Sequence, residues 1–497
     1  ALDLDLFKIE MANAPTPPEF DWEAPIKDAI KQVPLWPAPA RDAVIRVLRE
    51  IGMSPVDIGG FIKAMKSSVD MSYWRQITPL IPGHPTRFAL SNIEAWKALF
   101  SQASAEASWT RILHSPEDSK LYAIYDALQA KQGRDFLRPF DLPKGTAQWK
   151  GVEEFGYLTK DRLIPRLTSK IPTIKWSNRA FTTGTNSMSW GVFKDFYNAQ
   201  LRIAEKYASG ELTLKPGESF DILANMDAYA TMLADWTGRA GLGKLAEAAP
   251  LIGNVLYAPR FALGRLIGPR HLFSANKYVR AQAWKDAVAF IGVIGGTVLL
   301  GRQLGFWDVE TNKNSADYMK IRIGDRHIDP WGGAQQFVVF ASRVFDLLSA
   351  PITGKPAMGK STTTGAESPL NFETVLQNFL KSKEAPLIGL FNEYITGKTY
   401  SGEPLDVKNV KQWADRIVPM SIQDIWEALQ DKSITTAGKV ANSVLSFLGF
   451  GVQAYSGDWT QNIPKLGLPK YSDNLYYGLT EPVYDWADFY SDTVSQF

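Results

Sequence analysis

The spacing of apolar positions predicts helices along most of the chain. In residues 41–52 the apolar side chains recur every three or four positions, which is the repeat of a helix with one buried face. Strict alternation of apolar and polar residues, which is typical of strands, is almost absent. We therefore predict a mainly α, multi-helical fold. Further helices are predicted over residues 56–67, 92–103, 118–132, 188–209 and 220–235.

One segment does show the pattern of paired strands. In residues 319–323 apolar side chains alternate with Lys320 and Arg322, and Gly324 and Asp325 then precede a second short run at 326–328. A glycine in the first turn position accepts the positive φ of a type II′ turn. Residues 318–328 are therefore predicted to form one small β-hairpin with a structural role.

Prolines, glycines and charge divide the chain into six parts. Seven prolines in residues 1–40 favour extended backbone over helix. Segments rich in Gly and Pro at 142–145 and 350–368 mark joints between helical regions. The predicted parts are an extended N-terminal arm at 1–40, a helical domain at 41–145, a central helical domain at 146–310, the β-hairpin with a mobile loop at 311–360, a C-terminal helical region at 361–470 and a tail at 471–497.

The longest apolar run lies near the middle of the chain, at residues 287–301. These fifteen residues carry no charge and would extend about 22 Å as a helix, which is less than the roughly 30 Å of a bilayer core. Gly292 and Gly296 form a G-x-x-x-G pair, which permits close helix contact in lipid. Two interpretations stay open: a buried core helix of a soluble domain, or conditional membrane contact through Phe290, Ile291, Gly292 and Gly296.

A one-sided run of positive charge precedes this helix. Residues 248–285 contain no Asp or Glu. A basic segment beside an apolar helix suits a DNA backbone or an anionic lipid surface, whereas a solvated or internally paired face is the alternative. We refer to the basic residues as the cationic flank, and they are Arg260, Arg265, Arg270, Lys277, Arg280 and Lys285.

The last segment differs from the rest of the chain. Residues 471–497 contain no Lys or Arg, and acidic residues are mixed there with aromatic ones. Such a segment is typical of a docking tail that folds onto a partner or onto its own domain. The candidate docking residues are Tyr476, Tyr477, Tyr484, Trp486 and Phe489.

Composition limits the chemistry of the chain. There are no cysteines, which excludes disulfides and thiolate metal sites, and the four histidines are scattered. The net charge of +2 argues against wholesale coating of nucleic acid. Residues 354–361 match the spacing of a phosphate-binding loop, but no strand pattern precedes them and no helix pattern follows. We predict no catalytic, cofactor-binding or metal-binding residue, and no cofactor.

Several segments resemble, in the same order, the C-terminal portion of very large phage-borne polyvalent proteins. They include NVLYAPRFALGRL, NKYVRAQAWKDAVAFIGVIGGTVLL, DYMKIRIGDRHIDPWGGAQQFV, EYITGKTYSGEP, RIVPMSIQDIWEAL and SFLGFGVQAY, with VDMSYWRQITPLI and WSNRAFTTGTNSMSWGVFKDF upstream. The resemblance covers about residues 71–455. Proteins of this family are thought to be packed in virions and delivered with DNA.

The resemblance implies an internal structural or ejection protein of a tailed phage. It would assemble with itself and with other virion proteins inside the particle, and reach the host envelope or cytoplasm after ejection. The alternatives are a non-catalytic module of a large phage effector that acts in the host cytoplasm, and a cell-wall hydrolase. In each case DNA contact and membrane contact through the central stretch remain open.

Overall fold

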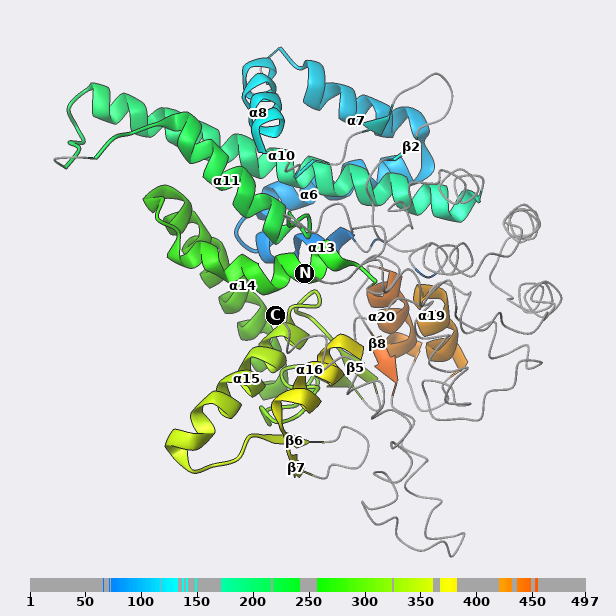
Figure 1. Cartoon of the computed structure of the whole chain (residues 1–497). Helices are drawn as coiled ribbons and strands as arrows, with labels where there is room; N and C mark the ends of the chain where they lie inside the picture. The colour runs from blue at the N-terminus through cyan, green and yellow to red at the C-terminus, as the bar shows by residue number, and fades with distance from the viewer. Residues whose placement is uncertain are drawn as a thin grey trace, which may run out of the picture. The chain divides into compact units, whose positions relative to one another are not determined.

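The computed structural model describes residues 66, 71, 73–116, 118–132, 136–137, 140–141, 148–149, 171–215, 218–241, 257–323, 326–360, 367–381, 420–430, 436–447 and 452–454 (Figure 1). All of them lie in one compact unit, Glu23–Tyr455. The predicted arm at 1–40 and the docking residues of the tail fall outside the described residues.

The described part of the chain is mainly helical, and short antiparallel strands supplement the helices, so the predicted fold class is confirmed. In the first half the elements are α5 (Tyr73–Ile77), η1 (Thr78–Leu80), α6 (Pro85–Phe100), α7 (Gln102–His114), α8 (Ser119–Gln132), β1 (Phe140–Asp141), β2 (Gln148–Trp149), α10 (Pro172–Ala208) and α11 (Ile222–Trp236). In the second half they are α13 (Pro259–Ile267), η4 (Gly268–Phe273), α14 (Lys277–Gln303), β3 (Asp308–Val309), β4 (Ile321–Ile323), β5 (Arg326–Ile328), α15 (Gln335–Thr353), β6 (Met358–Lys360), β7 (Glu367–Pro369), α16 (Phe372–Lys381), α19 (Met420–Gln430), α20 (Thr436–Phe447) and β8 (Val452–Ala454).

Helix α10 is the longest described helix and the centre of the first half (Figure 1). It packs along α6 and also contacts α5, α7 and α11. It begins at Pro172, whereas the apolar spacing predicted a start at 188. Residues 173–186 are rich in Ser, Thr and Asn and almost all are buried. Because residues 177–186 are all buried, this part of the helix shows no amphipathic repeat in its sequence.

A buried arginine joins α10 to the end of α6. The Arg179 side chain is 4% exposed; its Nε donates to the carbonyl of Ala98 at 2.9 Å, and Nη2 donates to the carbonyl of Leu99 at 2.8 Å. These carbonyls lie in the last turn of α6, where they have no partner within the helix. Burial lowers the pKa of Arg179. Arg179 of α10 therefore caps the C-terminal end of α6.

Helices on the two sides of residue 145 pack against each other. Helix α6, from the first predicted domain, shares its core with α10 from the second. A polar chain then connects α10, α11 and the start of α14: Asn225 donates to Gln200 at 2.8 Å, and Asn276 donates to Asn225 at 2.7 Å. The packing of α6 on α10 therefore crosses residue 145, and the polar chain extends the same group of helices to the start of α14.

The predicted hairpin is present as part of a larger sheet. Strands β4 and β5 pair with Ile321 opposite Ile328 and Ile323 opposite Arg326, which leaves the two-residue connection expected at 324–325. Strand β3 pairs with β4, and β8, from near residue 453, pairs with β5, so the order is β3-β4-β5-β8. The sheet therefore joins residues 308–328 to residues 452–454 through hydrogen bonds between strands.

Gly264 allows α13 to approach the end of α11 closely. A Cβ at this position would lie 2.3 Å from the backbone oxygen of Asp235, which cannot move aside without shifting α11. We expect Gly264→Ala to destabilise the protein by about 1–3 kcal/mol, although the same change in an open helix stabilises. The matched control is Gly296→Ala on α14, where a Cβ meets nothing within 4 Å and a gain of up to about 1 kcal/mol is expected.

Urea unfolding of the two variants measures this pair of opposite effects. Equal stability of Gly264→Ala and the unmodified protein would contradict the close approach of the two helices.

Candidate functional site

Helix α14, which contains the longest apolar run, has well-defined ends. The Asn276 side chain accepts from the backbone N–H groups of Tyr278 and Val279, both at 3.1 Å, and so caps the start. At the other end Gly305 has φ +75°, and the N–H of Phe306 donates to the carbonyl of Gly301 at 2.9 Å. This is the Schellman pattern. Local sequence therefore defines both ends of α14.

One side of α14 packs against the rest of the chain. Its only acidic residue, Asp286, is fully buried and accepts from His84 Nε2 at 3.1 Å and from Gln282 Nε2 at 2.8 Å. Farther along, Phe290 packs edge-to-face on Trp331, with ring centres 5.8 Å apart. The carboxylate thus points inward and leaves no negative charge on the outward side of α14.

The opposite side of α14 is apolar and exposed. Val288 and Ile291 are each 61% exposed, and the positions of Gly292 and Gly296 open onto free space. We refer to these exposed positions as the outward face; they are Val288, Ile291, Gly292, Val293, Gly296, Leu299 and Leu300. Among the described residues, α14 is the helix whose length and composition would suffice to cross a membrane, and 22% of its apolar window is buried. The predicted alternative of a buried core helix therefore does not describe α14.

The structure disperses the cationic flank. Arg265 is buried, and its guanidinium donates to the carbonyls of Arg75 at 2.7 Å, Gln76 at 3.1 Å and Trp236 at 3.3 Å. Burial lowers the pKa of Arg265 to about 9. Arg260 is half-buried on α13. Neither residue is placed to meet a DNA backbone together with the exposed members of the flank.

Two other members of the flank have carboxylate partners. Arg270 Nη2 donates to Asp235 at 2.9 Å, and the same carboxylate oxygen contacts His271 Nε2 at 2.7 Å. Lys277 pairs with Glu218 at 2.7 Å in an exposed position. Arg280 and Lys285 are exposed on α14 itself, and Arg280 donates to the carbonyl of Ser274 at 2.6 Å. Of the exposed members of the flank, Arg280 and Lys285 therefore belong to the same helix as the outward face, whereas Arg270 lies on η4.

The phosphate-loop spacing at 354–361 has no phosphate-loop structure. Gly354 ends α15 with φ +66°, and Gly359 and Lys360 lie in β6, which pairs with β7. Lys360 Nζ donates to Glu310 at 3.0 Å. A strand, loop and helix N-terminus that converge on a phosphate are not formed by the described residues here.

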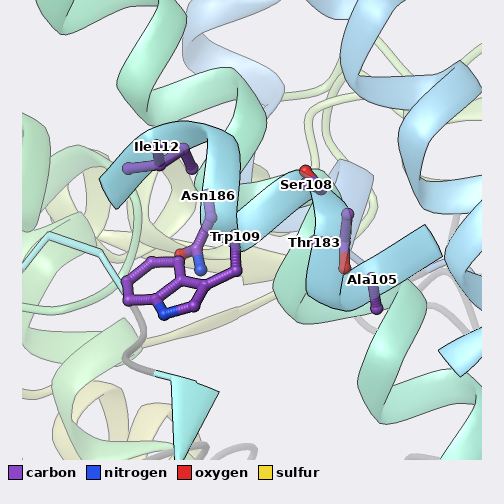
Figure 2. A pocket seen from close by; sticks show the side chains of 6 residues that line it. All are labelled: Ala105, Ser108, Trp109, Ile112, Thr183 and Asn186. Atoms are coloured by element: carbon purple, nitrogen blue, oxygen red, sulfur yellow. The ribbon is translucent and has the colours of Figure 1, made fainter. Parts of the chain in front are cut away.

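A hollow on the described surface lies between α7 and α10 (Figure 2). Its interior is too small to enclose a water molecule. No group of three or more His, Asp or Glu side chains within the described ranges is arranged to hold a metal ion. The hollow is lined by Ala105, Ser108, Trp109, Ile112, Thr183 and Asn186.

A second exposed apolar face lies on α15, and the sequence analysis did not identify it. Its exposed residues are spaced alternately by three and four, and Leu348 and Ile352 are 72% and 88% exposed. The spacing is visible in the sequence, but it does not say whether the stripe faces inward or outward. We call this set the α15 stripe; it consists of Val338, Ala341, Phe345, Leu348 and Ile352.

The chain matches no protein-family model, and the searches of curated proteins and of solved structures found no similar protein. The resemblance to phage polyvalent proteins therefore stays a prediction. The outward face of α14 and the α15 stripe are the features of the described chain that call for a binding partner, because large apolar patches are rare on monomeric proteins.

Proposed function

We propose that the chain is an internal structural protein of a tailed-phage virion, assembles with copies of itself and with other virion proteins, and enters the host with the genome. The resemblance of residues 71–455 suggests this role. The structural observation that supports it is the α15 stripe, an apolar seam on an ordered helix that other parts of the described chain leave exposed. Such a seam favours an assembly component over an independent soluble enzyme.

The α15 stripe is suited to pairing with the same helix of a second copy. Its 3-4 spacing is that of a two-helix seam, in which such residues fit between those of the facing helix. Val338 and Ile352 each lie seven positions from Phe345. In an antiparallel pair Phe345 would meet its counterpart, and each Val338 would face an Ile352. The seam is therefore self-complementary about a twofold axis, as a dimer of identical chains requires.

A charge placed in the α15 stripe tests this pairing. We expect Leu348→Glu to convert the oligomer to monomer at micromolar concentration, because the new carboxylates would have to be buried in the apolar seam. The matched control is Ser342→Glu, which adds the same charge to α15 outside the stripe. Sedimentation velocity of the full chain measures the change. A monomeric unmodified chain, or an oligomer that Leu348→Glu leaves intact, would contradict self-pairing through α15.

Quantitative mass spectrometry of purified particles tests the virion assignment. Particles are treated with nuclease and protease before disruption, so that only internal proteins survive. Recovery of this chain in many copies per particle supports the proposal, and its absence from protected particles overturns it. A few copies joined by continuous peptides to an enzymatic domain would favour the module of a large effector. Clearing of peptidoglycan in a zymogram would favour a cell-wall hydrolase.

A further inference from the structure

The outward face of α14 is suited to an anionic lipid bilayer, a partner that virion assembly by itself does not require. We propose that α14 binds such a bilayer by lying in the plane of its interface. Between Asp286, which points inward, and Arg302, every residue of α14 is uncharged. The outward side of this segment is formed by exposed Val, Ile, Leu and Gly residues, and the hydroxyl of Thr297 is the one polar side-chain group among them. An apolar surface of this kind partitions into the boundary between headgroups and acyl chains.

The charges around the outward face are complementary to anionic headgroups. Arg280 and Lys285 are exposed near the start of the apolar run, and Arg302 is exposed at its end. Arg302 lies 3.6 Å from Asp308, but both side chains are about half-exposed and such a pair is weak. Asp286, the only carboxylate on α14, is turned toward His84. The exposed surface of α14 therefore presents cations beside an apolar centre, and each cation favours an anionic membrane.

Exposed aromatic side chains flank the same run. Trp284 is 48% exposed, and its indole N–H donates to the carbonyl of Leu272 at 2.9 Å, so the ring meets solvent with its polar group already bonded. Phe273 and Phe306, before and after α14, are 79% and 67% exposed. Aromatic residues gather at the boundary between water and lipid in membrane proteins. Their positions before and after the apolar run match the two borders of a segment that lies in the membrane interface.

The buried side of α14 favours binding in the interface over spanning. Asp286 is held by His84, and farther along the helix Trp331 packs on Phe290 and lies beside Gly295. The helix is thus attached to the protein along its length. Its uncharged run of about 22 Å is also shorter than the roughly 30 Å core of a bilayer. Docking of the exposed side leaves these contacts intact.

Vesicle flotation of the full-length protein tests the proposal. Two vesicle types are compared: phosphatidylcholine alone, and phosphatidylcholine with an equal amount of phosphatidylglycerol. We expect the protein to float with the anionic vesicles, and Ile291→Glu to lower the partition coefficient by about tenfold or more. Arg280→Glu with Lys285→Glu should lower binding to the anionic vesicles by a similar factor.

Matched variants separate a local effect from a general loss of apolar surface or of charge. Leu429→Glu changes an exposed leucine on α19, and Arg202→Glu reverses an exposed cation on α10; both should float like the unmodified protein. Failure of the unmodified protein to float with either vesicle overturns the proposal, as does flotation that Ile291→Glu leaves unchanged. If Ile291→Glu instead abolishes self-association without affecting flotation, the outward face is an interface between copies.

A second measurement does not depend on introducing charge. Because the chain has no cysteine, Leu299→Cys can be labelled at that position alone with an environment-sensitive fluorophore. A blue shift on addition of the anionic vesicles supports insertion of the outward face. The same label at Leu429→Cys should not shift. An unchanged spectrum at Leu299 in vesicle-bound protein would refute the proposed orientation, whether or not the chain is a virion protein.

Discussion

Replacing Arg265 with alanine is expected to lower the free energy of unfolding by about 3–5 kcal/mol. The side chain is buried, and its guanidinium donates to carbonyls of Arg75, Gln76 and Trp236. Those carbonyls belong to α5 and α11, so one side chain from α13 connects two other helices. The substitution removes three hydrogen bonds and leaves the carbonyl groups buried without this donor. Urea unfolding followed by circular dichroism measures the loss.

Arg202→Ala is the matched control, because Arg202 is exposed on α10 and its loss should change stability by less than about 0.5 kcal/mol. Arg265→Lys should restore only part of the stability, since an ammonium cannot reach three carbonyls in the planar fork of a guanidinium. If Arg265→Ala were as stable as Arg202→Ala, the guanidinium would not connect these helices.

Asp317→Ala is expected to lower the free energy of unfolding by about 3–5 kcal/mol, because it removes the carboxylate that pairs with a buried ammonium. Lys320 Nζ lies 2.6 Å from one oxygen of Asp317, and His327 Nδ1 lies 2.9 Å from the other. The Lys320 and Asp317 side chains are 7% and 2% exposed. The cluster connects the loop before β4 to β5. The double variant Asp317→Ala with Lys320→Met removes both charges, and its free energy of unfolding should fall by less than that of Asp317→Ala alone.

The exposed pair between Lys313 and Asp346 provides a control for this experiment. Its nitrogen and oxygen are 2.8 Å apart, but the lysine is 57% exposed. Asp346→Ala should therefore cost no more than about 1 kcal/mol. If Asp317→Ala and Asp346→Ala lost the same amount of stability, burial would not strengthen the pair between Asp317 and Lys320.

The same carboxylate predicts how stability depends on pH. Burial alone would raise the pKa of Asp317, but the bonds from His327 and Lys320 outweigh it and hold the pKa below its ordinary value. A carboxylate with a lowered pKa contributes its full stability above the unfolded value and loses it as pH falls through the folded value. We expect the unmodified protein to lose stability below about pH 4 more steeply than Asp317→Asn. If the curves of stability against pH ran parallel for the two proteins, Asp317 would not contribute to the loss of stability in acid.

Local sequence predicted several of the helices that have one buried side, but the predicted range 92–103 runs across the boundary between α6 and α7. Helices α8 and α11 lie within one or two residues of the predicted ranges 118–132 and 220–235, because their apolar residues recur at the helical period. The first half of α10 was missed for the opposite reason: residues 177–186 are all buried, and their Ser, Thr and Asn side chains hide the helical period. The hairpin was predicted, but its pairing with β8 joins residues more than a hundred positions apart.

The sequence by itself determined that the chain is mainly α, that residues 287–301 form an uncharged helix, and that positive charge precedes it. These properties depend on neighbours within a few residues along the chain. Only the tertiary structure decided that α14 turns its apolar side outward, that Asp286 turns inward, and that Arg265 is buried against backbone carbonyls while Lys285 stays exposed. The physical reason is that an apolar helix has the same composition whether protein, lipid or a second copy covers it. Which side is covered depends on helices that are distant in sequence.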